Sequence, residues 1–332
     1  MRTNIVATII VCAGVLAGCG QNTGFLIKPV PLDEQLRETT VAADRGVFIR
    51  DKIAVVNVDG LILNDRRTGL LRTDENPVSL FVEQLDKAQA DGDVCAIIVR
   101  INSPGGGVTA SDIMHRRLVR LRETRHIPVI AVFEDVAASG AYYIACGADT
   151  IIAHPTTITG SIGVIVQTVS FAGAMGKLGI DAKAVTSGQF KDMLNPLKPL
   201  DERDAKIVQE MVNDYYGRFL SVVAAGRPKL SAEKIKTLAD GRVYTGKQAV
   251  DNGLVDALGY MDDAIALAKA KSGAKAVKIV MYHRPLGYRA NAYSTANASA
   301  DAPTQINLLN ISAPDLLWPS QPQFLYLWAA TR

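Results

Sequence analysis

Two side chains in this 332-residue chain, the hydroxyl of Ser139 and the amine of Lys191, could together carry out nucleophilic chemistry. Ser139 follows the apolar run 129–133 and precedes the small-residue segment 140–145, so we expect it where a buried strand turns into a helix. The N-terminus of a helix presents free backbone N–H groups and favours negative charge, which suits a developing oxyanion. A serine also needs a base, and a lysine amine kept neutral by burial can accept its proton.

A glycine-rich turn supplies a third element of such a site. The strand expected at Ile97-Ile98-Val99-Arg100-Ile101 leads into Asn-Ser-Pro-Gly-Gly-Gly at 102–107. Consecutive glycines allow backbone conformations closed to other residues and let a substrate come close, so this turn could aim an N–H group at an oxyanion. The turn lacks the Gly-Lys-Ser/Thr of a P-loop and the spacing of a dinucleotide fingerprint, which argues against phosphate binding.

Together these segments resemble the signal peptide peptidase A (SppA) family of Ser–Lys serine peptidases. The resemblance extends over about residues 50–275. The matching motifs occur in the order of the family: Asn-Ser-Pro-Gly-Gly-Gly (102–107), Ala-Ala-Ser-Gly-Ala-Tyr-Tyr-Ile-Ala (137–145), Thr-Gly-Ser-Ile-Gly-Val (159–164), Ser-Gly-Gln-Phe-Lys-Asp (187–192), Asp-Gly-Arg-Val-Tyr-Thr-Gly (240–246) and Gly-Leu-Val-Asp (253–256).

The resemblance implies a role for each of five residues. Ser139 would be the nucleophile and Lys191 the general base, with Ser161 holding the lysine amine by a hydrogen bond. The N–H groups of Gly106 and Gly140 would form the oxyanion hole. The resemblance also implies an α/β fold of the Clp protease/crotonase superfamily, built of repeated ββα units. Peptide substrates, the absence of a cofactor and a homo-oligomer with a shared chamber follow from it as further expectations.

Plainer interpretations of the same residues stay open. Ser139 could only cap a helix, Lys191 could be an exposed loop lysine, and Ser161 could satisfy a turn. Gly105 or Gly107 could take the place of Gly106 in the oxyanion hole.

His154 offers a different base. It stands where the SppA family more often has asparagine, so a Ser–His–Asp arrangement with Asp149 or Asp135 as the orienting carboxylate is conceivable. The lysine motif around Lys191 is intact, however, and a histidine base would not require it.

The N-terminal residues indicate where the protein acts. Met1-Arg2 is followed by a hydrophobic stretch of secretory-signal length and then by Leu16-Ala17-Gly18-Cys19, which resembles the lipobox of bacterial lipoproteins. We therefore expect a lipoprotein signal peptide over 1–18, lipidation of Cys19 and a membrane tether over 19–46. The corresponding localisation is the bacterial cell envelope, where a lipid would anchor the protein to the extracytoplasmic face of a membrane. An ordinary signal peptide with an incidental cysteine is the alternative.

Composition excludes several classes of function. The net charge is +3 and no basic patch interleaves with aromatic residues, so no nucleic-acid partner is expected. Cys95 and Cys146 are the cysteines left after the predicted signal and lipidation site, and both read as small buried apolar residues. No spacing of ligand residues indicates a metal site.

The body of the chain alternates predicted strands and helices, which favours an α/β peptidase domain over 47–288. Strands are expected at 53–58, 95–101, 128–133, 150–153 and 162–167, and helices at 110–124 and 139–147. A helix after Asp201 should bury the stripe Ile207, Met211, Tyr215, Phe219 and Val222. Residues 289–332 are predicted to be a flexible linker and a hydrophobic tail that packs on its own domain, joins subunits or visits the active-site groove.

Two classes of function compete at this stage. The first is a membrane-anchored serine endopeptidase that cleaves peptides such as released signal peptides or misplaced envelope proteins. The second is a non-proteolytic crotonase-like acyl-CoA enzyme or a catalytically dead scaffold. The presence of both Ser139 and Lys191 favours the peptidase, because crotonase-type enzymes do not need this pair.

Overall fold

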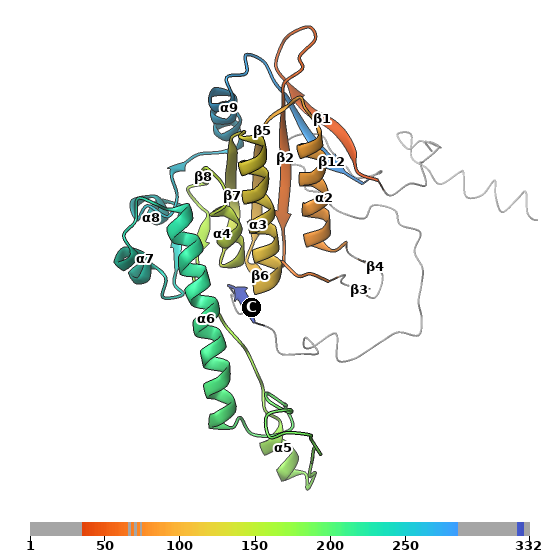
Figure 1. The fold of residues 1–332 in the computed structure, drawn as a ribbon, viewed down its shortest axis with the longest axis vertical. Coiled ribbons are helices and arrows are strands. Elements are labelled where there is room, and N and C mark those ends of the chain that lie inside the picture. Colours follow the sequence, from red (N-terminus) through yellow and green to blue (C-terminus); the bar gives the residue numbers. More distant parts are fainter. Residues whose placement is uncertain (1–34, 66–67, 70–71, 74, 285–323, 329–332) are drawn as a thin grey trace, which may run out of the picture. The chain divides into compact units, whose positions relative to one another are not determined.

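A computed structural model describes residues 35–65, 68, 69, 72, 73, 75–284 and 324–328. Its main sheet has the strand order β1-β12-β2-β5-β7-β8-β11, and β9 and β10 extend it beyond β7 (Figure 1). The strands of this sheet are β1 (Arg37–Ala43), β2 (Lys52–Asp59), β5 (Val94–Ser103), β7 (Val129–Ala138), β8 (Thr150–Ala153), β9 (Ile158–Gly160), β10 (Val243–Thr245), β11 (Ala257–Leu258) and β12 (Lys278–His283).

The centre of the sheet is parallel. Strands β12, β2, β5, β7, β8 and β11 pair in parallel, and β1 is antiparallel to β12 at one edge. Their continuous runs of valine, isoleucine and alanine suit strands that are covered on both faces. The predicted α/β fold class is therefore confirmed.

Helices cover the two faces of the sheet unequally. Helices α2 and α3 pack side by side on one face together with α4, and α9 covers the other face (Figure 1). The helices are α2 (Pro77–Ala90), α3 (Val108–Arg125), α4 (Gly140–Ala145), α5 (Ala172–Lys177), α6 (Glu202–Gly226), α7 (Ala232–Leu238), α8 (Gly246–Asp251) and α9 (Met261–Ser272).

Two small strand pairs complete the described structure. One joins β3 (Thr68–Gly69) to β4 (Arg72–Thr73), and the other joins β6 (Gly105–Gly107) to β13 (Leu325–Leu327). The second pair brings the C-terminal tail back to the glycine-rich turn, more than 200 positions earlier in the chain.

Three predictions differ from the structure. Residues 37–43 of the predicted tether form edge strand β1, because they pair with β12. The predicted strand 162–167 is wrong: β9 lies earlier, and within that range only Ile165 makes a strand-like bridge, to Leu325. The stripe of α6 is buried at Phe219 and Val222, but Met211 is 36% exposed.

Two expectations concern the membrane and the cysteines. The predicted signal peptide and Cys19 lie outside the described residues. None of the helices in the described part of the chain has the length and apolarity needed to cross a membrane. Cys95 is half-buried and Cys146 is buried, and both are free thiols.

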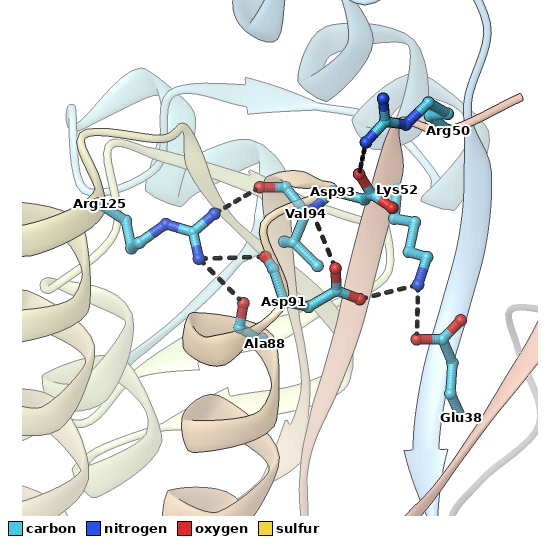
Figure 2. Close-up of polar contacts among 8 residues, drawn as sticks. All are labelled: Glu38, Arg50, Lys52, Ala88, Asp91, Asp93, Val94 and Arg125. Carbon is cyan, nitrogen blue, oxygen red and sulfur yellow. Dashed lines mark hydrogen bonds and ion pairs between the residues drawn. The ribbon is translucent and has the colours of Figure 1, made fainter.

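Arg125, the last residue of α3, ties α3 to the C-terminal end of α2. Its guanidinium donates hydrogen bonds to the carbonyl oxygens of Ala88, Asp91 and Val94, at 3.0–3.4 Å (Figure 2). These carbonyls lie at and just beyond a helix end that cannot satisfy its own acceptors, and a cation suits the negative end of the helix dipole.

Arg125→Ala should therefore lower the free energy of unfolding by about 2 kcal/mol. The matched control is Arg50→Ala in the same region, because the side chain of Arg50 is 83% exposed and pairs only with Asp93 among the contacts drawn in Figure 2. The midpoint of urea unfolding should move to a lower urea concentration for Arg125→Ala and stay nearly unchanged for Arg50→Ala. Equal shifts would contradict this account of the helix end.

Candidate active site

Ser139 stands at the junction predicted for it, between β7 and α4. Its backbone has φ 55° and ψ −114°, in a region that non-glycine residues rarely adopt. Its N–H donates to the carbonyl oxygen of Gly160 at 2.7 Å, which holds the junction in place. Its side chain makes no capping hydrogen bond, so the interpretation of Ser139 as a simple helix cap is wrong. Its Oγ is buried and has no hydrogen-bond partner among the described residues.

The glycine-rich turn lies directly against this junction. Gly105 has φ 98°, and a Cβ at Gly105 would lie 2.7 Å from the backbone nitrogen of Gly140. A Cβ at Gly106 would lie 2.0 Å from the carbonyl oxygen of Ile62. Side chains are therefore excluded at both positions, and the backbone of the turn approaches the start of α4 as only glycines allow.

The tail strand β13 lies along the other edge of this turn (Figure 1). Tyr326 stands opposite Gly106, and flanking bonds run from the Val108 N–H to the Phe324 carbonyl and from the Trp328 N–H to the Pro104 carbonyl. The two-residue spacing makes Gly106 and Tyr326 a hydrogen-bonded pair, in which the Gly106 N–H donates to the Tyr326 carbonyl oxygen. A Cβ at Gly140 would lie 3.1 Å from that oxygen and 3.2 Å from the Gly106 nitrogen.

Ser161 lies one residue beyond Gly160, the acceptor for the Ser139 N–H. It is 8% exposed and has φ 49°, and its own N–H donates to the Arg242 carbonyl oxygen at 2.8 Å. The structure thus brings Ser139, Ser161, Gly106 and Gly140 into one region.

Lys191 is not brought to this region by any described contact. Its side chain is exposed, and its backbone N–H donates to the Gly188 carbonyl at 3.1 Å. The segment that contains Lys191 is closed by a hydrogen bond between its two ends, in which the Phe171 N–H donates to the Pro196 carbonyl at 2.7 Å. The amine has no hydrogen bond or ion pair among the residues that the structure describes.

His154 is held away from Ser139 by the strand register. Ala153 of β8 pairs with Phe133 of β7, so His154 is level with residue 134, five residues before Ser139. Five strand residues span about 16 Å. The ring of His154 packs on Tyr260 with 4.9 Å between centroids, and burial lowers its pKa, opposed by the charge of Asp135.

Asp149 is likewise engaged elsewhere. Its carboxylate accepts the N–H of Val129 at 2.9 Å, at the opposite end of β7 from Ser139. Neither His154 nor Asp149 is therefore placed for a triad with Ser139.

Ser111 is a residue that the sequence analysis did not single out. It is fully buried in the first turn of α3, and its hydroxyl donates to the Gly107 carbonyl oxygen at 2.9 Å. A Cβ at Gly140 would come within 2.4 Å of this hydroxyl oxygen. Ser111 therefore fixes the turn against α4. Its position in the turn of helix after three glycines is the sequence signal that could have indicated it.

Tyr143 lies four residues after Ser139 in α4 and is held in place through its hydroxyl. The Tyr143 hydroxyl donates to the Asp112 carboxylate, which Arg218 also contacts at 3.1 Å. Burial raises the pKa of Asp112, but the bonds from Tyr143 and Arg218 outweigh it and hold this pKa below its usual value. Burial lowers the pKa of His115, which packs edge-on against Tyr143, to about 4, so this histidine is neutral at pH 7.

Comparison with known proteins identifies relatives of the chain. Residues 122–275 match the model of Peptidase family S49. A protein of Enterococcus faecium, provisionally named signal peptide peptidase SppA, is 38% identical over 231 residues, which are 70% of this chain and 67% of that protein.

Two further relatives carry protease names. A provisionally named protease of Synechocystis is 39% identical over 224 residues, which cover 68% of this chain and 76% of that protein. Protease 4 of Haemophilus influenzae is 36% identical over 222 residues, which cover 67% of this chain and 35% of that longer protein. On the evidence of these relatives, the chain belongs to the SppA family of serine peptidases, within Peptidase family S49.

Proposed function

We propose that this protein is a serine endopeptidase in which Ser139 attacks the carbonyl carbon of an extended peptide. The observation that carries the proposal is the hydroxyl of Ser139, which is buried without a described partner on a backbone at positive φ. Both features are unfavourable for stability, so a chemical role accounts for them better than a structural one. Hydrolysis of casein by the wild-type chain and by Ser139→Ala tests the proposal.

The glycine backbone would stabilise the transition state. The N–H groups of Gly106 and Gly140 are the candidates for the oxyanion hole, and the carbonyl oxygen of Tyr326 already lies beside both glycines. In the reaction, the serine hydroxyl loses its proton to the base as its oxygen bonds to carbon. The base then returns the proton to the departing amine, and water releases the acyl group in a second, equivalent step.

Lys191 is the proposed base, and Ser161 would orient its amine. For this role the amine has to reach Ser139, either by movement of its own segment or from a second copy of the chain. The segment around Lys191 favours a second copy, because it exposes apolar side chains that one copy leaves uncovered: Phe171, Leu178, Ile180, Val185, Leu197 and Leu200. Helix α5 within this segment has no buried residue.

A homo-oligomer would therefore complete the site as well as enclose it. The exposed part of α6 around Met211 adds to the uncovered apolar surface. Enclosure would restrict cleavage to unfolded or short peptides and protect neighbouring proteins. Anchoring through lipid on Cys19 would place this activity in the bacterial envelope, where released signal peptides are candidate substrates.

Replacement of His154 should separate the two candidate bases. His154→Ala should keep peptidase activity within about threefold of the wild type. The ring of His154 packs on Tyr260, and the strand register places it five residues away from Ser139. Lys191→Ala in the same assay should be inactive. A profile of kcat/KM against pH that loses a step near pH ~6.5 in His154→Ala, with Lys191→Ala still active, would instead assign the base to histidine.

A further inference from the structure

The loop that joins β1 to β2, residues 44–51, carries two adjacent apolar side chains in water (Figure 1). Val47 is 84% exposed and Phe48 is 93% exposed, the highest value of any aromatic side chain in the described residues. Phe48 also has φ 61°, a left-handed backbone that is unfavourable for a bulky residue. Exposure and strain both lower stability, so a contact outside the chain accounts for this residue better than a structural role does.

The loop is anchored at the end of the sheet opposite the candidate active site. It precedes the start of β2, whereas Ser139 follows the far end of the parallel strand β7. The Asp44 N–H donates to the Val277 carbonyl oxygen, and the Asp44 carboxylate accepts the Val277 N–H, both at 3.0 Å. The Lys278 N–H donates to the Asp51 carbonyl oxygen at 2.9 Å. A partner that covers this fixed loop would leave the region of Ser139 open.

The apolar surface of the loop is too small for a protein partner. Among residues 35–53 and 269–278, the segments at this end of the sheet, the exposed large apolar side chains are Val47 and Phe48. A stable protein interface buries about 800 Å² on each side around an apolar centre of many residues. Two adjacent apolar side chains suit a lipid surface instead, where aromatic rings prefer the level of the headgroups.

The charge around the loop is positive. Four cations at this end of the sheet have no ion pair with any described residue: Arg45, Lys271, Lys275 and Lys278. Asp51 is an exposed carboxylate in the same condition, while Asp44 is paired with Lys269 at 2.6 Å. Arg50 is paired with Asp93 at 3.2 Å (Figure 2). The excess of cations complements the headgroups of anionic phospholipids.

We propose that Val47 and Phe48 insert into the surface of an anionic phospholipid membrane and that the surrounding cations bind its headgroups. This membrane contact is independent of the peptidase function. It agrees with the predicted lipid on Cys19, because the 18 positions from Cys19 to Arg37 of β1 reach about 60 Å when extended, enough for the lipid and the loop to meet one membrane.

Fluorescence of a tryptophan placed in the loop tests the contact. The full-length Phe48→Trp chain is mixed with phosphatidylcholine vesicles that contain about one third phosphatidylglycerol and brominated acyl chains, which quench only tryptophans that enter the bilayer. We expect the loop tryptophan to lose about half of its emission, compared with vesicles without bromine. Emission that bromine leaves unchanged would overturn the proposal.

A tryptophan elsewhere on the surface is the matched control. Val185 is also fully exposed but lies in the segment of Lys191, so the added tryptophan of Val185→Trp should keep its emission. Trp318 and Trp328 contribute the same background to both chains. Equal quenching of the two added tryptophans would mean that the protein adsorbs without a preferred face, and would contradict the assignment to this loop.

Charge reversal tests the role of the cations. Arg45→Glu in the Phe48→Trp chain should lose most of the quenching, whereas Lys206→Glu, at an exposed position near the start of α6, should leave it unchanged. Vesicles of phosphatidylcholine alone should quench at most about half as strongly, and equal quenching would overturn the assignment to an anionic membrane. A blue shift that grows with protein concentration without vesicles would assign the loop to contacts between copies instead.

Discussion

Ser139→Ala should lower kcat/KM toward unstructured peptides by a factor of about 10⁴ to 10⁶. The reason is that the hydroxyl oxygen forms the new bond to the peptide carbonyl, and no other described serine has both a buried, unpartnered oxygen and a place beside Gly106 and Gly140. Stability should change little, because the hydroxyl makes no described hydrogen bond that alanine would remove.

The control for this loss is Ser221→Ala, on the exposed side of α6, where the hydroxyl bonds only to the Gly217 carbonyl of its own helix. Its activity should match the wild type. Casein cleavage by Ser139→Ala above background, with a circular dichroism spectrum like that of the wild type, would mean that another group attacks the substrate.

Lys191→Ala and Lys191→Arg should each lose at least about 10³-fold in kcat/KM. Arginine keeps its proton and cannot serve as a base, so it should not rescue the alanine variant. The matched control is Lys183→Ala in the same segment, whose side chain is 83% exposed and pairs with Asp181. It should retain full activity.

Mixing two inactive variants tests whether the lysine comes from a second copy. If Lys191 of one copy serves Ser139 of its neighbour, equal amounts of Ser139→Ala and Lys191→Ala, exchanged into common oligomers, should regain about one quarter of wild-type activity. Oligomers of this kind that stay inactive would place both residues of the pair in one copy. Full activity of Lys191→Ala alone would remove lysine from the mechanism.

The sequence predicted the centre of the fold well, because its strands carry their own signal. Runs such as 96–99 and 129–133 are apolar at every position, which suits parallel strands covered on both faces. Ser139 and the three glycines at the ends of these strands could be found for the same reason, since their positions follow from where the apolar runs stop.

The remaining features depend on contacts between distant segments. Nothing local in Phe324-Leu325-Tyr326 indicates that it pairs with Gly105–Gly107, because strand register is set by the partner that is available. The apolar stripe of α6 predicted burial along the whole helix, but Met211 stays exposed. A sequence pattern does not say whether the surface that packs against such a stripe belongs to the same chain. The exposure of the Lys191 side chain could not be predicted for the same reason, because its motif does not say which segment packs against it.

Reaction with a fluorophosphonate probe, followed by mass spectrometry of the digested protein, tests the central claim most directly. The account predicts one stoichiometric adduct on Ser139 in the wild-type chain, and its loss in Ser139→Ala and Lys191→Ala. An adduct on Ser103, Ser111 or Ser161 instead, or labelling of Ser139 at the same rate without Lys191, would contradict the proposed pair.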